Sequence, residues 1–163
     1  MSDGKYITEK ELALKLIKNN KYMVLATSDQ KLKPWASPIL YVHDQNYDFY
    51  FLSAIDSVHA KNITSNPQVS IAIFNSTQAI GLSEGIQAEA TASVVGKDVI
   101  TGVINLYCEK LFPDSDMSPT QRYRPDDYLE PAEFRFFKIH PTKVFITSNV
   151  DRRVEVQLSE TKT

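Results

Sequence analysis

Four polar side chains lie close together in one stretch of the sequence, and together they could bind a phosphate group. Ser53, Ser57, His59 and Lys61 surround the start of a short helix predicted over 57–65, with Ser57 as its N-cap. The first turn of a helix has unpaired backbone N–H groups and carries the positive end of the helix dipole. Hydroxyl, imidazole and ammonium groups placed there would complete a phosphate site. The alternative is that Ser57 only caps the helix, that His59 is an ordinary surface histidine and that Lys61 is solvated.

A second group of candidates lies in the long segment 113–131, which holds four of the eight prolines. Arg122, Tyr123 and Arg124 in this segment could clamp an anionic substrate or reach a partner subunit. The alternative is a solvated loop with no binding role. The single cysteine, Cys108, has no histidine or aspartate placed to activate it, and we expect no nucleophile there. The ligand spacing of a zinc site and the glycine-rich run of a phosphate loop are also missing.

Length and charge narrow the class of protein. The chain has 163 residues, which suits a single domain, and a net charge of −2, which lacks the basic excess of a nucleic-acid-binding protein. Its apolar runs are only a few residues long, whereas a membrane span needs about 20. One cysteine cannot form an intrachain disulfide, which is typical of a reducing compartment. We therefore expect a cytoplasmic protein with no membrane or nucleic-acid partner.

The elements that must position these side chains are mostly strands. Thr8 and Glu11 have the spacing of a capping box at the start of a helix. The segment 86–95 alternates apolar and polar residues, which predicts a long strand with one solvated face. Strands are predicted over 22–28, 35–43 with a break at Pro38, 47–53, 68–75, 86–95, 133–139, 143–147 and 153–158, and helices over 9–19, 57–65 and 98–112, the last with Asp98 as its cap.

The order of these elements indicates the fold class. Many strands and few helices, without the repeated strand–helix–strand pattern of a parallel sheet, predict a mainly β protein. We expect a small antiparallel barrel with flanking helices, formed by one domain over residues 1–163, in which 113–131 is a long loop.

The segment from Phe51 to Phe74 resembles the phosphate-binding segment of the pyridoxamine 5′-phosphate oxidase-like family, the FMN-binding split barrels. In that family a strand ends in a small polar residue, and a Ser-Arg-Lys type run, a short helix, Asn-Pro-x-Val and the next strand follow. This sequence has SVHAKN over 57–62 and NPQV over 66–69. Upstream, LATSDQKLKPWASPILYV is similar to the strand, polar turn and flavin-edge strand of the family.

The resemblance implies an antiparallel split β-barrel of the FMN-binding type, with FMN as cofactor. Carried over by position, one strand segment would lie along the isoalloxazine edge, a second would lie near the ribityl-phosphate arm and the short helix would hold the phosphate. These three sets are Ser37, Pro38, Ile39 and Leu40; Leu52 and Ser53; and Ser57, His59 and Lys61. The family builds its site between two subunits, so a homodimer is expected. The polar face of 86–95, with Gln87, Thr91 and Ser93, and the long loop 113–131 agree with a partner subunit.

Departures from the family pattern bear on the substrate. True pyridoxamine phosphate oxidases have an arginine at the position of Ser37, a lysine at that of Val42 and an Arg-Lys pair where this chain has Val58 and His59. Their C-terminal substrate region has no match here, since the only tryptophan is Trp35. We therefore predict an FMN-dependent oxidoreductase that acts on an unknown small molecule. The alternative is a non-catalytic binding protein for FMN or a related cofactor, either haem or a deazaflavin.

Overall fold

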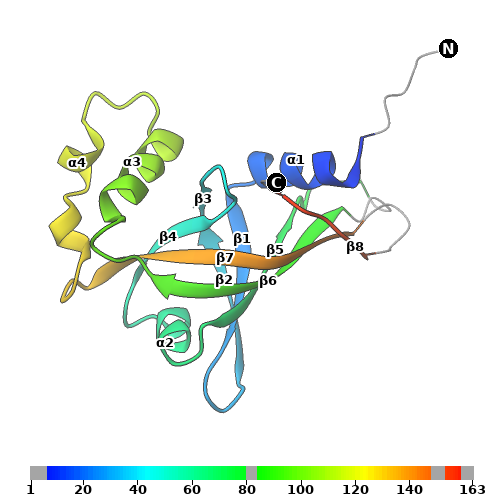
Figure 1. Cartoon of the computed structure of the whole chain (residues 1–163), viewed down its shortest axis with the longest axis horizontal. Helices are drawn as coiled ribbons and strands as arrows, with labels where there is room; N and C mark the ends of the chain where they lie inside the picture. Colours follow the sequence, from blue (N-terminus) through cyan, green and yellow to red (C-terminus); the bar gives the residue numbers. More distant parts are fainter. Residues whose placement is uncertain (1–6, 80–83, 148–152, 159–163) are drawn as a thin grey trace.

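A computed structural model of the chain describes residues 7–79, 84–147 and 153–158. Within these residues, one antiparallel sheet of eight strands is flanked by short helices (Figure 1). The strands are β1 Tyr22–Ser28, β2 Pro34–Leu40, β3 Val42–His43, β4 Phe49–Ala54, β5 Gln68–Phe74, β6 Gly85–Val94, β7 Phe134–Thr147 and β8 Arg153–Glu155. The helices are α1 Glu9–Asn19, α2 Val58–Ser65, α3 Ile100–Leu111, α4 Pro119–Arg122 and the 3-10 turn η1 Pro125–Tyr128.

The strand order closes the sheet into a half-barrel. The strands follow the order β2-β1-β5-β6-β7-β4-β3, with β8 added at β7. The strands β2 and β3 are consecutive in the sequence, yet they stand at opposite ends of this order. The sheet must therefore curl so that its two ends meet, as a split barrel does. The predicted fold class is confirmed.

The strand predicted over 35–43 is interrupted at Tyr41 and not at Pro38. Pro38 belongs to β2, an edge strand of the sheet, and lies opposite Val24 of β1. An edge strand tolerates proline because its outer row of N–H groups has no strand to bond. At Tyr41 the backbone N–H donates to the Lys21 carbonyl (3.1 Å) and the phenol donates to the Ile17 carbonyl (2.8 Å). These bonds turn the chain out of the β1 pairing, and β3 then pairs with β4.

Near the C-terminal end, two strands that were predicted separately form a single strand. The segments 133–139 and 143–147 form the continuous β7, because a bulge accommodates Pro141. Glu89 of β6 pairs with Lys143 and Ala90 pairs with Pro141, which leaves Thr142 as the extra residue. The strand predicted over 153–158 is shorter, as β8, and residues 148–152 between it and β7 lie outside the described residues.

The helices agree with the sequence in place but not in every detail. The capping box of α1 is confirmed, since the Glu11 N–H donates to Thr8 Oγ1 (3.1 Å) and the Thr8 N–H donates to the Glu11 carboxylate (2.8 Å). The helix α3 has Val99 and not Asp98 at its N-cap, with no side-chain hydrogen bond. Cys108 belongs to this helix and is buried. The predicted loop 113–131 contains α4 and η1, each with a proline in its first turn.

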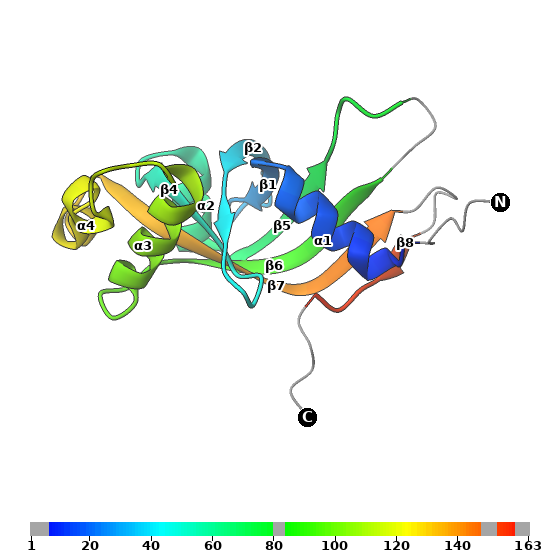
Figure 2. The ribbon, with the colours of Figure 1, turned by 90° about the horizontal axis from the view of Figure 1, so that it is seen from above.

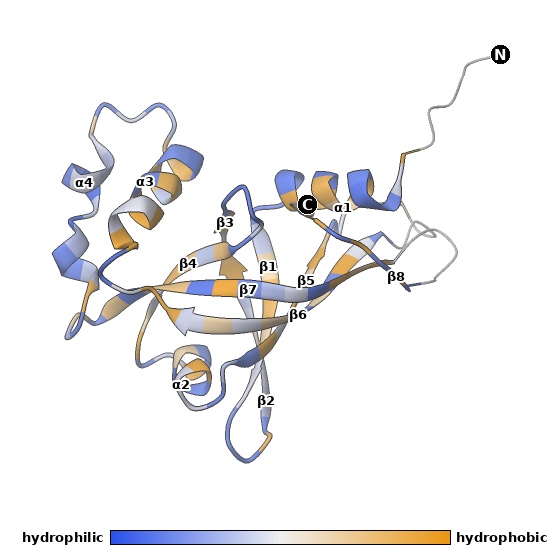
Figure 3. Cartoon of the chain, in the orientation of Figure 1, coloured by the Kyte–Doolittle hydropathy of each residue, from blue (hydrophilic) through white to orange (hydrophobic). Residues whose placement is uncertain are grey.

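The ladder between β4 and β7 separates two apolar clusters. Phe51 and Phe137 stack at 5.1 Å on the barrel side, where α1 also packs. Tyr50 and Phe136 point to the other side, where α3 covers them. Figure 2 shows α3 and α4 gathered at one end of the molecule, and Figure 3 shows apolar residues along β5 and β6 and on alternating positions of α1 and α3. Of the helices in the described residues, none is long and apolar enough to span a bilayer.

Candidate functional site

Four of the residues predicted to bind a cofactor meet in one place, which we call the hydroxyl–imidazole cluster: Ser37 of β2, Ser53 of β4, and Ser57 and His59 at the start of α2. The two ring nitrogens of His59 contact hydroxyls on opposite sides. Nδ1 lies 3.2 Å from Ser37 Oγ. Nε2 lies 2.8 Å from Ser53 Oγ and 3.2 Å from Ser57 Oγ. His59 therefore joins β2 to the short segment that contains the end of β4 and the start of α2.

Side-chain hydrogen bonds to β1, which could not be predicted from the sequence, hold the helix α2 in place. Asn62 is buried in the middle of α2 and donates to Thr27 Oγ1 at 3.0 Å. Asn66, just beyond the helix, donates to Ser28 Oγ at 3.1 Å. Ser57 caps the helix as predicted, since its Oγ accepts the Ala60 N–H at 3.3 Å. The helix α2 is thereby held beside β1 and β2, and its buried Ala60 and Ile63 belong to the same core cluster as α1, although the two helices lie at opposite edges of the sheet in Figure 1.

The hydrogen bonds of the cluster begin at one donor that cannot accept. The indole Nε1–H of Trp35 donates to Ser37 Oγ at 3.0 Å. A hydroxyl has one proton and two acceptor lone pairs, so Ser37 can either donate to His59 Nδ1 or accept from it. With a neutral imidazole protonated on Nε2, Ser37 donates to Nδ1 and the Nε2–H donates to Ser53 or Ser57. The Ser53 and Ser57 oxygens lie 3.4 Å apart, so one of these hydroxyls can donate to the other and the second can donate to a ligand.

The environment of His59 favours this neutral state. Its ring lies 5.9 Å from the ring of Phe51, and burial lowers its pKa from the ordinary 6.5. Its hydrogen-bond partners among the described residues are hydroxyls, without a carboxylate. A neutral set of donors at a helix N-terminus can bind an anionic or strongly accepting group. The cluster contains no carboxylate to act as a general base.

The other predicted cofactor residues are not part of the cluster. Lys61 is exposed on α2, and none of the ion pairs in the described part of the chain includes it. Leu52 packs toward α3, because neighbouring residues in a strand point to opposite faces. Ile39 is buried in the barrel core, whereas Pro38 is exposed and Leu40 half-buried. For Ile39 and Leu52, only the backbone remains available to a ligand.

The arginine–tyrosine run of the long segment is used locally. Tyr123 lies in an aromatic group with Tyr107 (5.8 Å), Tyr128 (5.6 Å) and Phe136 (6.3 Å). The Arg122 guanidinium lies 4.4 Å from the centre of the Phe112 ring and donates to Ser115 Oγ at 2.9 Å. These contacts belong to the α3 end of the molecule and do not join the hydroxyl–imidazole cluster. Exposed Arg124 precedes η1, and a role toward a partner subunit stays a prediction.

Sequence reasoning missed Arg135, which pairs directly with Ser53 across the β4–β7 ladder. The Nε atom of Arg135 is buried and has no hydrogen-bond partner among the described residues. The available signal was a charged residue inside the apolar run FRFFKI, at a position that alternation places on the face of Phe137. Trp35 and Asn62 were also missed, and nothing in their local sequence marks them.

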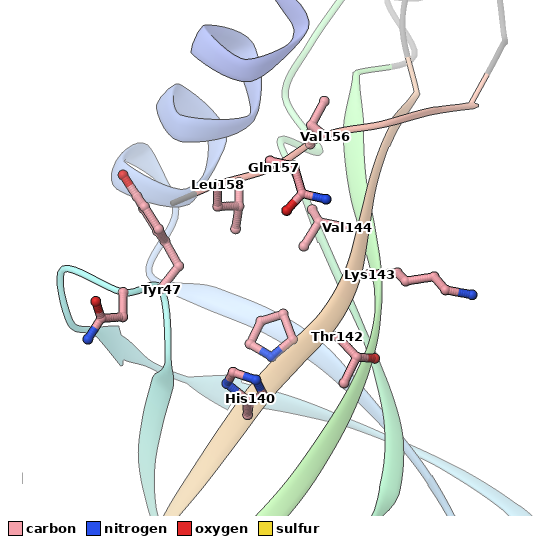
Figure 4. Close-up of a pocket in the computed structure, with 10 residues that line it drawn as sticks. Tyr47, His140, Thr142, Lys143, Val144, Val156, Gln157 and Leu158 are labelled. Atoms are coloured by element: carbon pink, nitrogen blue, oxygen red, sulfur yellow. The ribbon is translucent and has the colours of Figure 1, made fainter. Parts of the chain in front are cut away.

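A second histidine cluster lies at the other end of the same ladder. The buried Asp48 binds His140 Nδ1 at 2.6 Å and forms an ion pair with Lys138. Figure 4 shows His140 on β7 at a shallow pocket, with Tyr47 and Leu158 across from it. In the described part of the chain, no three histidine, cysteine or acidic side chains gather as metal ligands.

The comparisons with known proteins agree with this geometry. The sequence model of the family described as pyridoxamine 5′-phosphate oxidase matches residues 9–148. Similar solved structures include HutZ, the haem storage protein of Vibrio cholerae, with 23% identity over 86% of this chain and 96% of that chain, at a TM-score of 0.66.

Two further solved structures share the fold. A Clostridium acetobutylicum protein related to general stress protein 26 has 13% identity over 93% of this chain and 97% of that chain, at a TM-score of 0.63. An F420 reductase has 14% identity over 80% and 93%, at a TM-score of 0.55. No curated protein matches the sequence.

Proposed function

Because the chain belongs to the pyridoxamine 5′-phosphate oxidase family, we propose that it is an FMN-dependent oxidoreductase acting on a small molecule. The observation that carries this proposal is the hydroxyl–imidazole cluster, in which the Ser53 and Ser57 hydroxyls and His59 converge at the start of α2. A phosphate needs several convergent donors, and this cluster supplies them where the family binds its cofactor.

In this proposal the residues of the chain bind and orient the cofactor. Ser53, Ser57 and the first-turn amides of α2 would hold the phosphate, and His59 would keep the two hydroxyls aimed at it. The backbone of β2 from Ser37 to Leu40 would lie along the flavin ring. The bound flavin would supply hydride and electron transfer. Our proposal does not extend to oxidation of a vitamin B6 phosphate, because Ser37 and Val42 stand where that activity uses an arginine and a lysine.

We also propose that the protein is a homodimer whose cofactor sites lie between subunits. The outward face of the sheet supports this, since small and apolar side chains lie at its centre, with Ser70, Gln87, Glu89 and Arg153 on the same face and two exposed aromatics beside them. The central residues are Val24, Ala26, Ala72 and Phe145, and the aromatics are Tyr22 (61% exposed) and Phe74 (51% exposed). A second copy would cover this face, and a stable dimer of this kind buries at least about 2,000 Å² in total.

Sedimentation at low micromolar protein, with and without FMN, tests the dimer. We expect a species of twice 18.5 kDa, and we expect Ala72→Arg to yield a monomer with weakened flavin binding. The control is Lys97→Glu, an exposed position before α3 that should leave the dimer intact. A monomer that binds stoichiometric FMN would contradict both the dimer and the shared site.

The alternative proposal is a binding protein for haem or a deazaflavin. HutZ is a haem storage protein and another solved structure is an F420 reductase, so this fold occurs in proteins described by either cofactor. His140 favours haem, because its Nδ1 is held by Asp48 and its exposed Nε2 would be available as an axial ligand. The pocket beside it is shallow and largely polar in a single chain, which favours flavin at the hydroxyl–imidazole cluster.

One experiment separates these functions. Purified protein is denatured, and the released chromophore is identified by mass and absorbance. Released FMN would support our proposal. A Soret band would support haem binding, and a released deazaflavin would support deazaflavin binding. Titration of stripped protein should give tighter binding of FMN than of riboflavin, and bleaching by NAD(P)H would establish turnover. Equal affinities for FMN and riboflavin would remove the phosphate from the site.

A further inference from the structure

The hydroxyl–imidazole cluster has donors but no positive charge of its own. His59 is held by three serine hydroxyls and has no charged hydrogen-bond partner among the described residues. Lys61 is exposed on α2, outside the hydrogen bonds of the cluster. A phosphate monoester carries about two negative charges near neutral pH. A site for it would be incomplete without a nearby cation.

Arg135 is placed to be that cation. It lies directly opposite Ser53 in the antiparallel ladder of β4 and β7, and such pairs have Cβ atoms about 4.5–5.5 Å apart on the same face. Two residues further along, Phe51 and Phe137 form the next pair on this face and stack at 5.1 Å. Because Phe51 also lies beside His59, the face that carries Arg135 is the face of the cluster.

The guanidinium of Arg135 is also incompletely satisfied. Its Nε is buried without a hydrogen-bond acceptor, and none of the ion pairs in the described residues includes it. A buried donor without an acceptor is destabilising and is rare in folded proteins. A bound anion beside Ser53 would give this N–H an acceptor.

We propose that Arg135 is a binding residue for the phosphate group of the cofactor, completing the hydroxyl–imidazole cluster from β7. The proposal deepens the proposed function and rests on it for the identity of the phosphate carrier. In this arrangement, the positive charge comes from the strand opposite Ser53 and not from α2. The planar guanidinium offers several donors in fixed directions, which suits phosphate oxygens better than a lysine ammonium does.

The test uses full-length protein and two probes, FMN against riboflavin and inorganic phosphate. Arg135→Gln should weaken FMN binding about ten- to hundredfold and leave riboflavin binding unchanged. The FMN affinity of Arg135→Lys, which keeps the charge, should lie between those of the wild type and Arg135→Gln. The control, Lys110→Gln, removes one charge from the exposed face of α3 and should bind like the wild type.

Inorganic phosphate gives a readout that does not depend on flavin. In NMR spectra, phosphate should shift the His59 ring resonances of the wild type and of Arg135→Lys but not those of Arg135→Gln, with sodium chloride of equal ionic strength as the reference. Melting curves establish that each variant is folded. If Arg135→Gln retained the preference for FMN and the phosphate shift, or if the wild type showed neither, the proposal would be wrong.

The probes also separate this proposal from the proposed function. A phosphate response at His59 that depends on Arg135, in a protein that binds no flavin, would support the anion site and overturn the FMN assignment. The reverse result is FMN binding that is tighter than riboflavin binding and indifferent to Arg135. It would overturn the role of Arg135 and leave the FMN assignment standing. An Arg135→Gln variant that only weakens the dimer would count against the proposal.

Discussion

The two ends of the β4–β7 ladder each hold a histidine, and the two clusters differ in how their charges are balanced. At the Phe49–Ile139 end, Asp48 is buried and binds both His140 and Lys138. At the Ser53–Arg135 end, His59 is held by three hydroxyls and Arg135 has a buried donor without an acceptor. The first cluster is satisfied by its own residues, whereas the second is completed only by an added acceptor.

On our proposal, the first cluster contributes to stability and the second binds a ligand. A buried carboxylate that is paired with cations contributes to the fold as long as both partners remain. A set of donors without acceptors adds little to stability in the free protein and gains its partners from a ligand. Mutations at the two ends should therefore have opposite signatures.

The largest effect on stability is expected at the satisfied end. Asp48→Ala leaves Lys138 and His140 without their carboxylate, and we expect the free energy of unfolding to fall by about 1–3 kcal/mol. Affinity for FMN should not change. Urea denaturation measures the first effect and a flavin titration the second. Glu109→Ala, which breaks an exposed pair with Lys110, serves as the control and should stay within about 0.5 kcal/mol.

The opposite signature is expected for Ser53→Ala. Loss of one hydroxyl should weaken FMN binding by about 0.5–1.5 kcal/mol, and riboflavin binding and the melting temperature should hardly change, because Ser57 still forms a hydrogen bond with His59. Ser76→Ala, an exposed turn position, is the matched control. A variant that unfolds readily but binds FMN normally would show that this end is structural too.

A pH titration sharpens the comparison at His59. Burial lowers the pKa of His59 below 6.5 in the folded protein, so just below that pH the unfolded chain binds more protons. The free energy of unfolding should therefore fall as the pH drops from about 7.5 to about 5.5, and less so in His59→Gln. Denaturant midpoints at several pH values measure this. Identical pH profiles for the two proteins would mean that His59 does not contribute.

The smallest effect is expected for Lys61→Ala, although the sequence placed Lys61 at the phosphate. The side chain is exposed on α2, and an exposed charge near an anion contributes about 0.2–1 kcal/mol. FMN affinity should fall about fivefold at most, and the loss should shrink with added salt. A loss comparable to that of Arg135→Gln would place the cation of the site on α2 and not on β7.

The fold could be predicted where local patterns decide it. The capping box of Thr8 and Glu11 fixed the start of α1, and alternation located β5 and β6. The break at Tyr41 could not be predicted, because it depends on contacts with Ile17 and Lys21 that bring distant segments together. The continuity of β7 through Pro141 depends on a bulge set by its partner strand.

The site was predicted where residues are near in sequence or match the family pattern. Ser53, Ser57 and His59 lie within one short segment, and Ser37 was placed with them only through the resemblance. Arg135 joins them through strand register, which no local pattern reveals. Leu52 was misplaced as a side chain for a related reason, since the phase of a strand that is buried on both faces cannot be read from its apolar residues.

The indole of Trp35 gives the hydrogen-bond chain a further property. It is the only tryptophan of the protein, and its Nε1–H is one hydroxyl away from His59. The tryptophan fluorescence of the chain therefore originates next to the candidate site. Protonation of His59 or the arrival of a flavin alters the surroundings of this single tryptophan, so the protein carries its own optical probe of the site.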